Sequence, residues 1–154
     1  MPSNLDRIII SDTACLIGLT NIGWIDILKE MSSSVIVTPE VAKEFGEPLP
    51  EWITIKEVSD SEKIKILNKF IGLGESSAIA LAIEIGNALL IVDDKRARQF
   101  ALSLDLEITG TLGLLIRAYK NGIINDIDSI IANLRKANFR LPANTEILIK
   151  NIKK

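Results

Sequence analysis

Two short apolar runs, each followed directly by aspartate, constrain the fold of this chain most strongly. Residues 7–11 lead into Asp12, and residues 88–92 lead into Asp93 and Asp94. Apolar runs of about four to eight residues, rich in β-branched side chains, are typical of strands buried on both faces, as in parallel sheets covered by helices. The two runs therefore predict an α/β protein in which each strand leads into a helix.

The rest of the chain alternates between strand-like and helix-like segments. Further strands are predicted at residues 34–37, 52–56 and 106–108. Helices are predicted at residues 12–31 with a break near 21–23, and then at 38–46, 59–70, 75–86, 95–103, 110–122, from 125 onward and at 142–151. This alternation predicts a parallel sheet covered on both sides. The length of the chain suits a single domain, residues 1–154, with a core at about residues 6–140.

Local signals mark where several of these helices begin. Thr38 is predicted as an N-cap, with Pro39 at the first helical position. Ser59 and Glu62 have the spacing of a capping box. Glu75 follows a glycine-containing break and is predicted to open the next helix.

Composition excludes several classes of protein. The chain has no histidine, which excludes Ser-His-Asp hydrolysis and histidine-based acid-base catalysis. Cys15 is the single cysteine, so an intrachain disulfide and a cysteine-rich zinc site are excluded, and we expect it to be a small core residue. A net charge of −2 argues against a uniformly basic nucleic-acid coat protein.

The sequence contains no signal for a membrane. No stretch approaches the roughly 20 uninterrupted apolar residues of a membrane span. The first residues lack the basic-then-apolar layout of a signal peptide. We therefore expect a cytoplasmic protein that makes no membrane contact.

Carboxylates are predicted to gather at one edge of the sheet. Right-handed crossovers place the carboxyl ends of all parallel strands at the same edge, where ligands bind in open α/β sheets. Asp12 therefore shares that edge with Asp93 and Asp94. Two helical acids are candidates to join them, because Glu44 borders the apolar stripe of its helix and Glu75 begins a closely packing, small-residue face.

Each of these acids also has a purely structural explanation. Asp12 and the Asp93–Asp94 pair could cap helices, Glu75 suits the positive end of a helix dipole, and Glu44 could be a surface residue. Together, however, converging carboxylates repel one another unless a cation compensates them. An all-oxygen ligand set points to Mg²⁺ or Mn²⁺. One or two such ions would activate water for attack on a phosphodiester.

Other side chains near the acids are candidates for contact with a substrate. Lys95, Arg96 and Arg98 directly follow the aspartate pair and are candidate contacts to a phosphate backbone, with solvated surface as the alternative. Thr13 and Thr111 could orient a water or a phosphate through their hydroxyls, and capping or packing explains them equally well.

Five segments in order resemble the PIN-domain nucleases. They are residues 10–13, residues 37–41 with Glu44, residues 72–75, residues 90–94 with Arg98, and residues 108–113. The likeness spans about residues 6–140 and is greatest to the VapC-like prokaryotic branch, which has a Gly-Glu third acid and an Asp-Asp or Asp-Glu fourth motif.

This resemblance implies a three-layer α/β/α sandwich and a metal-dependent endoribonuclease. Carried over by position, Asp12, Glu44, Glu75 and either Asp93 or Asp94 would bind Mg²⁺ or Mn²⁺, and Asp93 is favoured because it directly follows the strand. Thr13 matches the small hydroxyl residue after the first acid. VapC-type members commonly pair with a small antitoxin protein and form homodimers. The resemblance therefore implies three candidate partners: an RNA substrate, an antitoxin and a second copy of the chain.

Two other functions fit parts of the pattern. A PIN fold could serve as a non-catalytic module that binds RNA or protein, although such a module is expected to have lost some of the acids. A phosphotransfer receiver domain also carries acids beyond its strands. It needs a lysine after a late strand, where this chain has residues 109–111, Thr-Gly-Thr.

Overall fold

A parallel sheet of five strands lies at the centre of the protein in the computed structural model, which describes residues 7–153. The strands are β1 (Ile8–Ser11), β2 (Val35–Val37), β3 (Ile53–Ile55), β4 (Ala88–Ile91) and β5 (Ile108–Thr109). They lie in the order β3-β2-β1-β4-β5, and every neighbouring pair is parallel. The predicted α/β class and parallel sheet are confirmed, while the last strand lies slightly later than the predicted 106–108.

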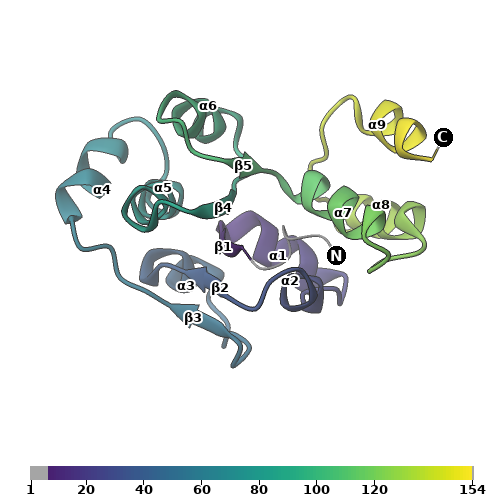
Figure 1. Ribbon diagram of the computed structural model, residues 1–154, viewed down its shortest axis with the longest axis horizontal. Helices are drawn as coiled ribbons and strands as arrows, with labels where there is room; N and C mark the ends of the chain where they lie inside the picture. Colours follow the sequence, from purple (N-terminus) through teal and green to yellow (C-terminus); the bar gives the residue numbers. More distant parts are fainter. Residues whose placement is uncertain (1–6, 154) are drawn as a thin grey trace.

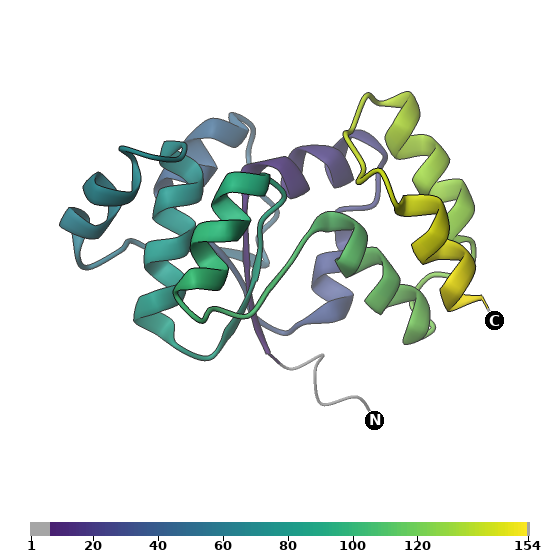
Figure 2. The ribbon, with the colours of Figure 1, turned by 90° about the horizontal axis from the view of Figure 1, so that it is seen from above.

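The strand order has its switch point between β1 and β4. From β1 the chain moves outward through β2 to β3, and it then returns to β4 on the other side of β1 and continues to β5. At such a switch point the connections diverge and leave a crevice beyond the strands' carboxyl ends. Ser11 pairs with Ile91, so the residues that follow these strands begin at the same level. Figure 2 shows β1 running from the N-terminal side toward the helix that follows it.

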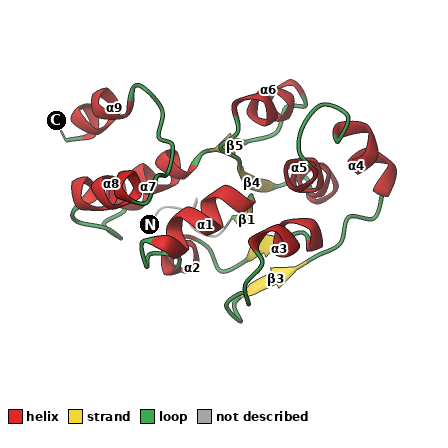
Figure 3. Ribbon diagram, turned by 180° about the vertical axis from the view of Figure 1, so that it is seen from behind, coloured by secondary structure: helices red, strands yellow, loops and turns green. Residues whose placement is uncertain are grey.

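Helices cover both faces of the sheet (Figure 3). Along the chain they are α1 (Thr13–Asn21), α2 (Asp26–Met31), α3 (Pro39–Phe45), α4 (Ser61–Leu67), α5 (Leu73–Ile85), α6 (Lys95–Ser103), α7 (Thr111–Lys120), α8 (Ile127–Lys136) and α9 (Thr145–Ile152). Successive strand residues face opposite sides, so Ile9 packs with α1, α2, α3, α7 and α8 while Ile10 packs with α4, α5 and α6. The three-layer α/β/α sandwich is thereby confirmed.

The two ends of the molecule are helical. Figures 1 and 2 both place α4 at one end and α8 with α9 at the other. Ile149 of α9 is buried with the core residues of α7 and α8. Cys15 is fully buried in the same core, as its apolar neighbours predict.

None of the helices in residues 7–153 combines the length and the apolar character that crossing a membrane requires.

Several helix starts follow the local signals and others do not. Thr38 caps α3 by accepting a hydrogen bond from the Val41 N–H at 3.1 Å, as predicted. In contrast, α5 begins at Leu73, two residues before the predicted start at Glu75. The cap is Gly72, which has no side chain to signal it. Glu75 therefore lies within the first turn, where a carboxylate interacts favourably with the helix dipole.

The predicted capping box at Ser59 and Glu62 is wrong. Asp60 caps α4 instead, and its carboxylate accepts a hydrogen bond from the Glu62 N–H at 3.1 Å. The N–H groups of Ser59 and Asp60 donate to the carboxylate of Glu84 on α5, both at 2.9 Å. A residue distant in sequence thus satisfies the donors that a local box would have satisfied, and it ties the start of α4 to α5.

Candidate active site

Asp12 lies at the crevice and joins the two central strands. It follows β1 and is almost completely buried, with 2% of its surface exposed. One carboxylate oxygen, Oδ1, accepts a hydrogen bond from the Cys15 N–H at 2.9 Å and so caps α1. The other, Oδ2, accepts from the Asp93 N–H at 2.8 Å. The capping explanation for Asp12 is therefore correct, and the same carboxylate also holds the start of the loop that follows β4.

Asp93 is held in turn by Thr111, the first residue of α7. The Thr111 N–H donates to Oδ1 of Asp93 at 2.8 Å, and the Thr111 hydroxyl donates to Oδ2 at 2.6 Å. Thr111 is completely buried. Its hydroxyl thus orients an acid, a role that the sequence analysis did not predict for it.

Arg98 points back toward this pair of acids. Its Nη1 donates a hydrogen bond to the Val92 carbonyl at 3.0 Å. A Cβ atom placed on Gly110 would lie 2.9 Å from both Arg98 Nη1 and Asp93 Oδ1, so the bare glycine leaves room for the two side chains. Arg98 therefore contributes a positive charge beside Asp93 within the site.

Asp94 differs from Asp93 in its surroundings. It is exposed, and its Oδ2 caps α6 by accepting a hydrogen bond from the Ala97 N–H at 2.9 Å. Lys95 and Arg96 follow in the first turn of α6 and are also exposed. Asp93 is consequently half-buried between Asp12 and Thr111, whereas Asp94 lies at the exposed start of α6.

Glu44 and Glu75 are brought to the same edge by the packing of α3 on α5. The Thr13 hydroxyl donates to Oε1 of Glu44 at 2.6 Å, which places this acid beside the start of α1. A Cβ atom on Gly74 would lie 2.1 Å from that Oε1, so the Glu44 side chain rests on the bare backbone at the start of α5. Glu75 follows Gly74 and is half-buried.

Two buried hydroxyls hold the start of α3 against α5. Thr38 and Ser77 lie 2.6 Å apart through their hydroxyl oxygens, and the Ser77 hydroxyl lies 2.8 Å from the Gly74 carbonyl that it bonds. The sequence analysis did not assign either residue to the site. The small hydroxyl of Ser77, four residues after Leu73 in a helix of small side chains, is the only local signal of this close approach.

The acids interact electrostatically across the site. Burial raises the pKa of Asp12 to about 8, and the charges of Asp93 and Glu75 add to the increase. Burial also raises the pKa of Asp93, opposed by the hydrogen bonds from Thr111 and by the charge of Arg98. The pKa of Glu75 is raised first by burial and then by the charges of Asp94 and Glu44. Neighbouring acids thus act on the pKa values of Asp12 and Glu75, and the charges that do so are those of the other predicted acids.

A hard divalent cation fits the chemistry of this group. All the candidate ligand atoms are oxygens, and neighbouring carboxylates add to the raised pKa values of Asp12 and Glu75, so a cation would lower the repulsion at these two acids. Over residues 7–153, no three acidic, histidine or cysteine side chains are close enough to enclose a metal ion as they stand. Mg²⁺ needs only one or two protein carboxylates and keeps several waters, so the arrangement suits it without a complete cage.

Glu40 is a further acid beside Glu44, and the sequence analysis did not select it as a candidate. It lies one turn before Glu44 on α3, and the two line a shared pocket with Lys43 and Leu73. The Oε1 atom of Glu40 is buried without a hydrogen-bond partner among residues 7–153.

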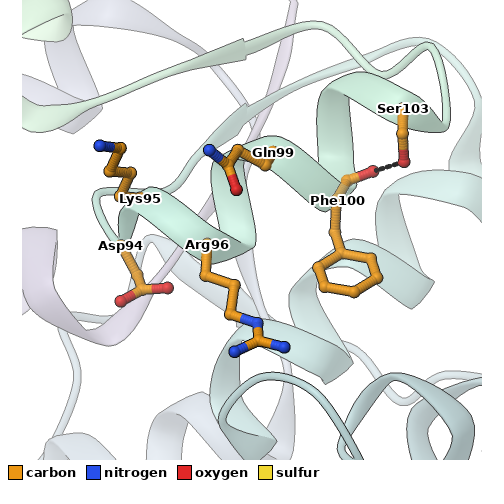
Figure 4. Close-up of a pocket in the computed structure, with 6 residues that line it drawn as sticks. All are labelled: Asp94, Lys95, Arg96, Gln99, Phe100 and Ser103. Atoms are coloured by element: carbon orange, nitrogen blue, oxygen red, sulfur yellow. Dashed lines mark hydrogen bonds between the residues drawn. The ribbon is translucent and has the colours of Figure 1, made fainter.

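Two open pockets begin at Asp94. The first, of about 400 Å³, is lined by Glu75, Asp94 and Arg96 together with residues 68–72. The second, of about 680 Å³, extends along α6 from Asp94 to Ser103 (Figure 4). Lys95 and Arg96 thus border open space next to Asp94.

Comparison with known protein families matches residues 8–152 to the family described as the PIN domain. No curated protein matches the chain.

Proposed function

This chain belongs to the PIN-domain family, whose members are generally nucleases, and we propose that it is a metal-dependent endoribonuclease of the VapC-like branch. The observation that carries the proposal is the Asp12–Asp93 pair at the switch point of the sheet, in which Asp12 is buried, Asp93 is half-buried, and the charge of Glu75 adds to the raised pKa of Asp12. Its acids are more costly to ionise without a cation than with one. Such a pair is expected in a metal site, where a cation offsets the cost of ionising both acids.

We propose that Asp12, Glu44, Glu75 and Asp93 hold Mg²⁺ or Mn²⁺. Asp94 remains the alternative to Asp93, and the position of Asp93 between Asp12 and Thr111 favours it. When bound, the ion would activate water and offset the charge that develops on the phosphodiester. The chain's own contribution is orientation, because Thr111 fixes the Asp93 carboxylate and Thr13 fixes that of Glu44.

The proposed substrate is RNA that approaches over the start of α6. Lys95 and Arg96 would bind its phosphates beside Asp94. Arg98, which also bonds the Val92 carbonyl, would offset negative charge near Asp93. A small antitoxin, a homodimer and a cytoplasmic location follow as proposals from the likeness to VapC-type toxins.

Cleavage of a mixed single-stranded RNA tests the function. We expect cleavage products with Mg²⁺ or Mn²⁺ and none with EDTA. Recovery of activity after Mn²⁺ is added back to the EDTA-treated protein controls for loss of folded protein. A folded protein that binds this RNA but does not cleave it with either metal would support the non-catalytic binding module.

The substitution Gly74→Ala tests the role of Glu44 separately. The new Cβ would overlap the Glu44 carboxylate and displace it, and a misplacement of about 1 Å can reduce a catalysed rate by about 100-fold. Alanine favours a helix over glycine, so we expect an unchanged or slightly higher melting temperature.

Cleavage rates and thermal melts of Gly74→Ala and Gly113→Ala give the comparison. The Gly113 variant is the matched control, because its Cβ would overlap the hydroxyl of Thr109 and no acid. Wild-type cleavage by Gly74→Ala would remove Glu44 from the proposed metal ligands.

A further inference from the structure

Two phenylalanines, Phe70 and Phe100, lie next to the predicted acids Glu75 and Asp94. Phe70, in the segment between α4 and α5, is 50% exposed, although large apolar side chains in folded proteins are usually buried. Its ring lies 5.5 Å from that of Phe100 on α6, centroid to centroid, with the ring planes inclined by 35°. The chain has only four phenylalanines, so half of them meet at this surface.

Basic side chains surround this aromatic pair. Lys69 and Arg96 line the same pocket as Phe70, and Lys95 and Arg96 line the same pocket as Phe100. Figure 4 shows Arg96 and Phe100 projecting from the same side of α6, one turn apart. Within residues 7–153 the ion pairs use Arg7, Lys65, Arg135 and Lys153, so none uses these three cations.

The aromatic surface is continuous with the acids. Asp94 lines both pockets, and Glu75 lines the one that contains Phe70. A polymer that rests on Phe70 and Phe100 would therefore lie beside Glu75 and Asp94. The surface that it meets alternates aromatic rings with positive charges.

We propose that Phe70 and Phe100 form a stacking subsite for a base of single-stranded RNA, with Lys69 and Arg96 binding the adjoining phosphates. This inference rests on the proposed function and specifies its substrate as single-stranded. Stacked bases and a positively charged groove are the two contacts that single strands use. In a duplex the base faces are covered by neighbouring pairs, so a duplex could use only the phosphate contacts.

Equilibrium binding in EDTA tests the subsite without any cleavage. The probes are a fluorescent 8-nucleotide RNA, the same strand with abasic residues at its centre, and a duplex of the same sequence, followed by anisotropy. Wild type should bind the intact strand more tightly than the other two. Phe70→Leu and Phe100→Leu, which keep apolar bulk, should each weaken binding of the intact strand by about 5- to 100-fold.

Two further variants separate stacking from other effects. Arg96→Gln should weaken intact and abasic strands equally and lower the salt dependence, because it removes a phosphate contact. Trp24→Leu is the aromatic control, since Trp24 is 37% exposed and lies between α1 and α2, which cover the opposite face of the sheet. It should leave binding unchanged.

The possible results distinguish the subsite from the enzymatic function. Equal binding of intact and abasic strands, or leucine variants that bind as wild type does, would overturn the subsite even if Mn²⁺-dependent cleavage is found. Base-dependent binding that both leucine variants lose would support the subsite even if no cleavage occurs, and would then leave only the nuclease proposal contradicted.

Discussion

Replacement of Asp12 by asparagine should reduce RNA cleavage by more than about 100-fold, because even residues that merely orient a metal ligand typically change metal affinity or activity by about 10- to 100-fold. The protein should remain folded. Asparagine is as good an N-cap as aspartate, so its oxygen can still accept from the Cys15 N–H. The amide nitrogen would then face the Asp93 N–H and leave that donor without an acceptor, at a cost of about 1–3 kcal/mol.

Initial cleavage rates with Mn²⁺ and thermal melts of the same preparations measure this effect. Asp26→Asn provides the matched control, because Asp26 is an exposed acid in the first turn of α2. The control should cleave at the wild-type rate. If Asp12→Asn does so too, Asp12 is not a metal ligand.

The second large effect is expected in the stability of the metal-free protein as pH changes. The pKa of Asp12 is about 8 in the folded protein, compared with 3.8 for an ordinary aspartate side chain. A raised carboxyl pKa means that the folded state retains its proton more strongly than the unfolded state does. Its contribution is therefore fully present below about pH 4 and is lost as the pH rises through about 8. Burial shifts Asp93 and Glu75 in the same direction.

We therefore expect the melting temperature in EDTA to fall between pH 5 and pH 8. Because the chain has no histidine, no imidazole titrates in this interval to obscure the trend. Glu84, whose pKa is lowered by the N–H groups of Ser59 and Asp60, acts in the opposite sense and at lower pH. The effect of Glu84 on stability can therefore be distinguished from that of Asp12.

Mn²⁺ should reverse this loss, and more strongly at pH 8 than at pH 5, because protons compete with the metal for the carboxylates. At 100 times its dissociation constant a ligand contributes about 2.7 kcal/mol, which raises the melting temperature of a chain of this size by roughly 5–10 °C. Asp12→Asn should show a smaller increase and a weaker pH dependence. Calorimetry or circular dichroism with EDTA and with Mn²⁺ at both pH values decides the point, and a metal effect equal at pH 5 and pH 8 would contradict it.

The sheet and the edge at which the acids gather were predictable because they depend on short-range patterns. The apolar runs before Asp12 and Asp93 determine two central strands, and parallel topology then places their ends together. The start of α3 was equally readable, because the Thr38 side chain itself supplies the cap.

Contacts between distant residues could not be predicted in this way. Nothing near Asp93 in the sequence shows that Thr111 will bond both of its oxygens, since that depends on how β5 leads into α7. The start of α5 was missed because its cap is a glycine. Phe100 has the spacing of an ordinary helix residue, and only the packing of α6 beside the Phe70 segment reveals the aromatic pair.

The hydrogen bonds that connect Asp12, Asp93 and Thr111 have a consequence for synthesis of the protein. They join residues 81 and 18 positions apart, so the site exists only after segments from most of the chain have met. Domains emerge from the ribosome with their N-terminal part first, which means that Asp12 is made long before Thr111. If the chain is the ribonuclease proposed above, it would stay inactive on the ribosome until the segment beyond residue 111 has emerged, and the message that encodes it would be protected during most of its own translation.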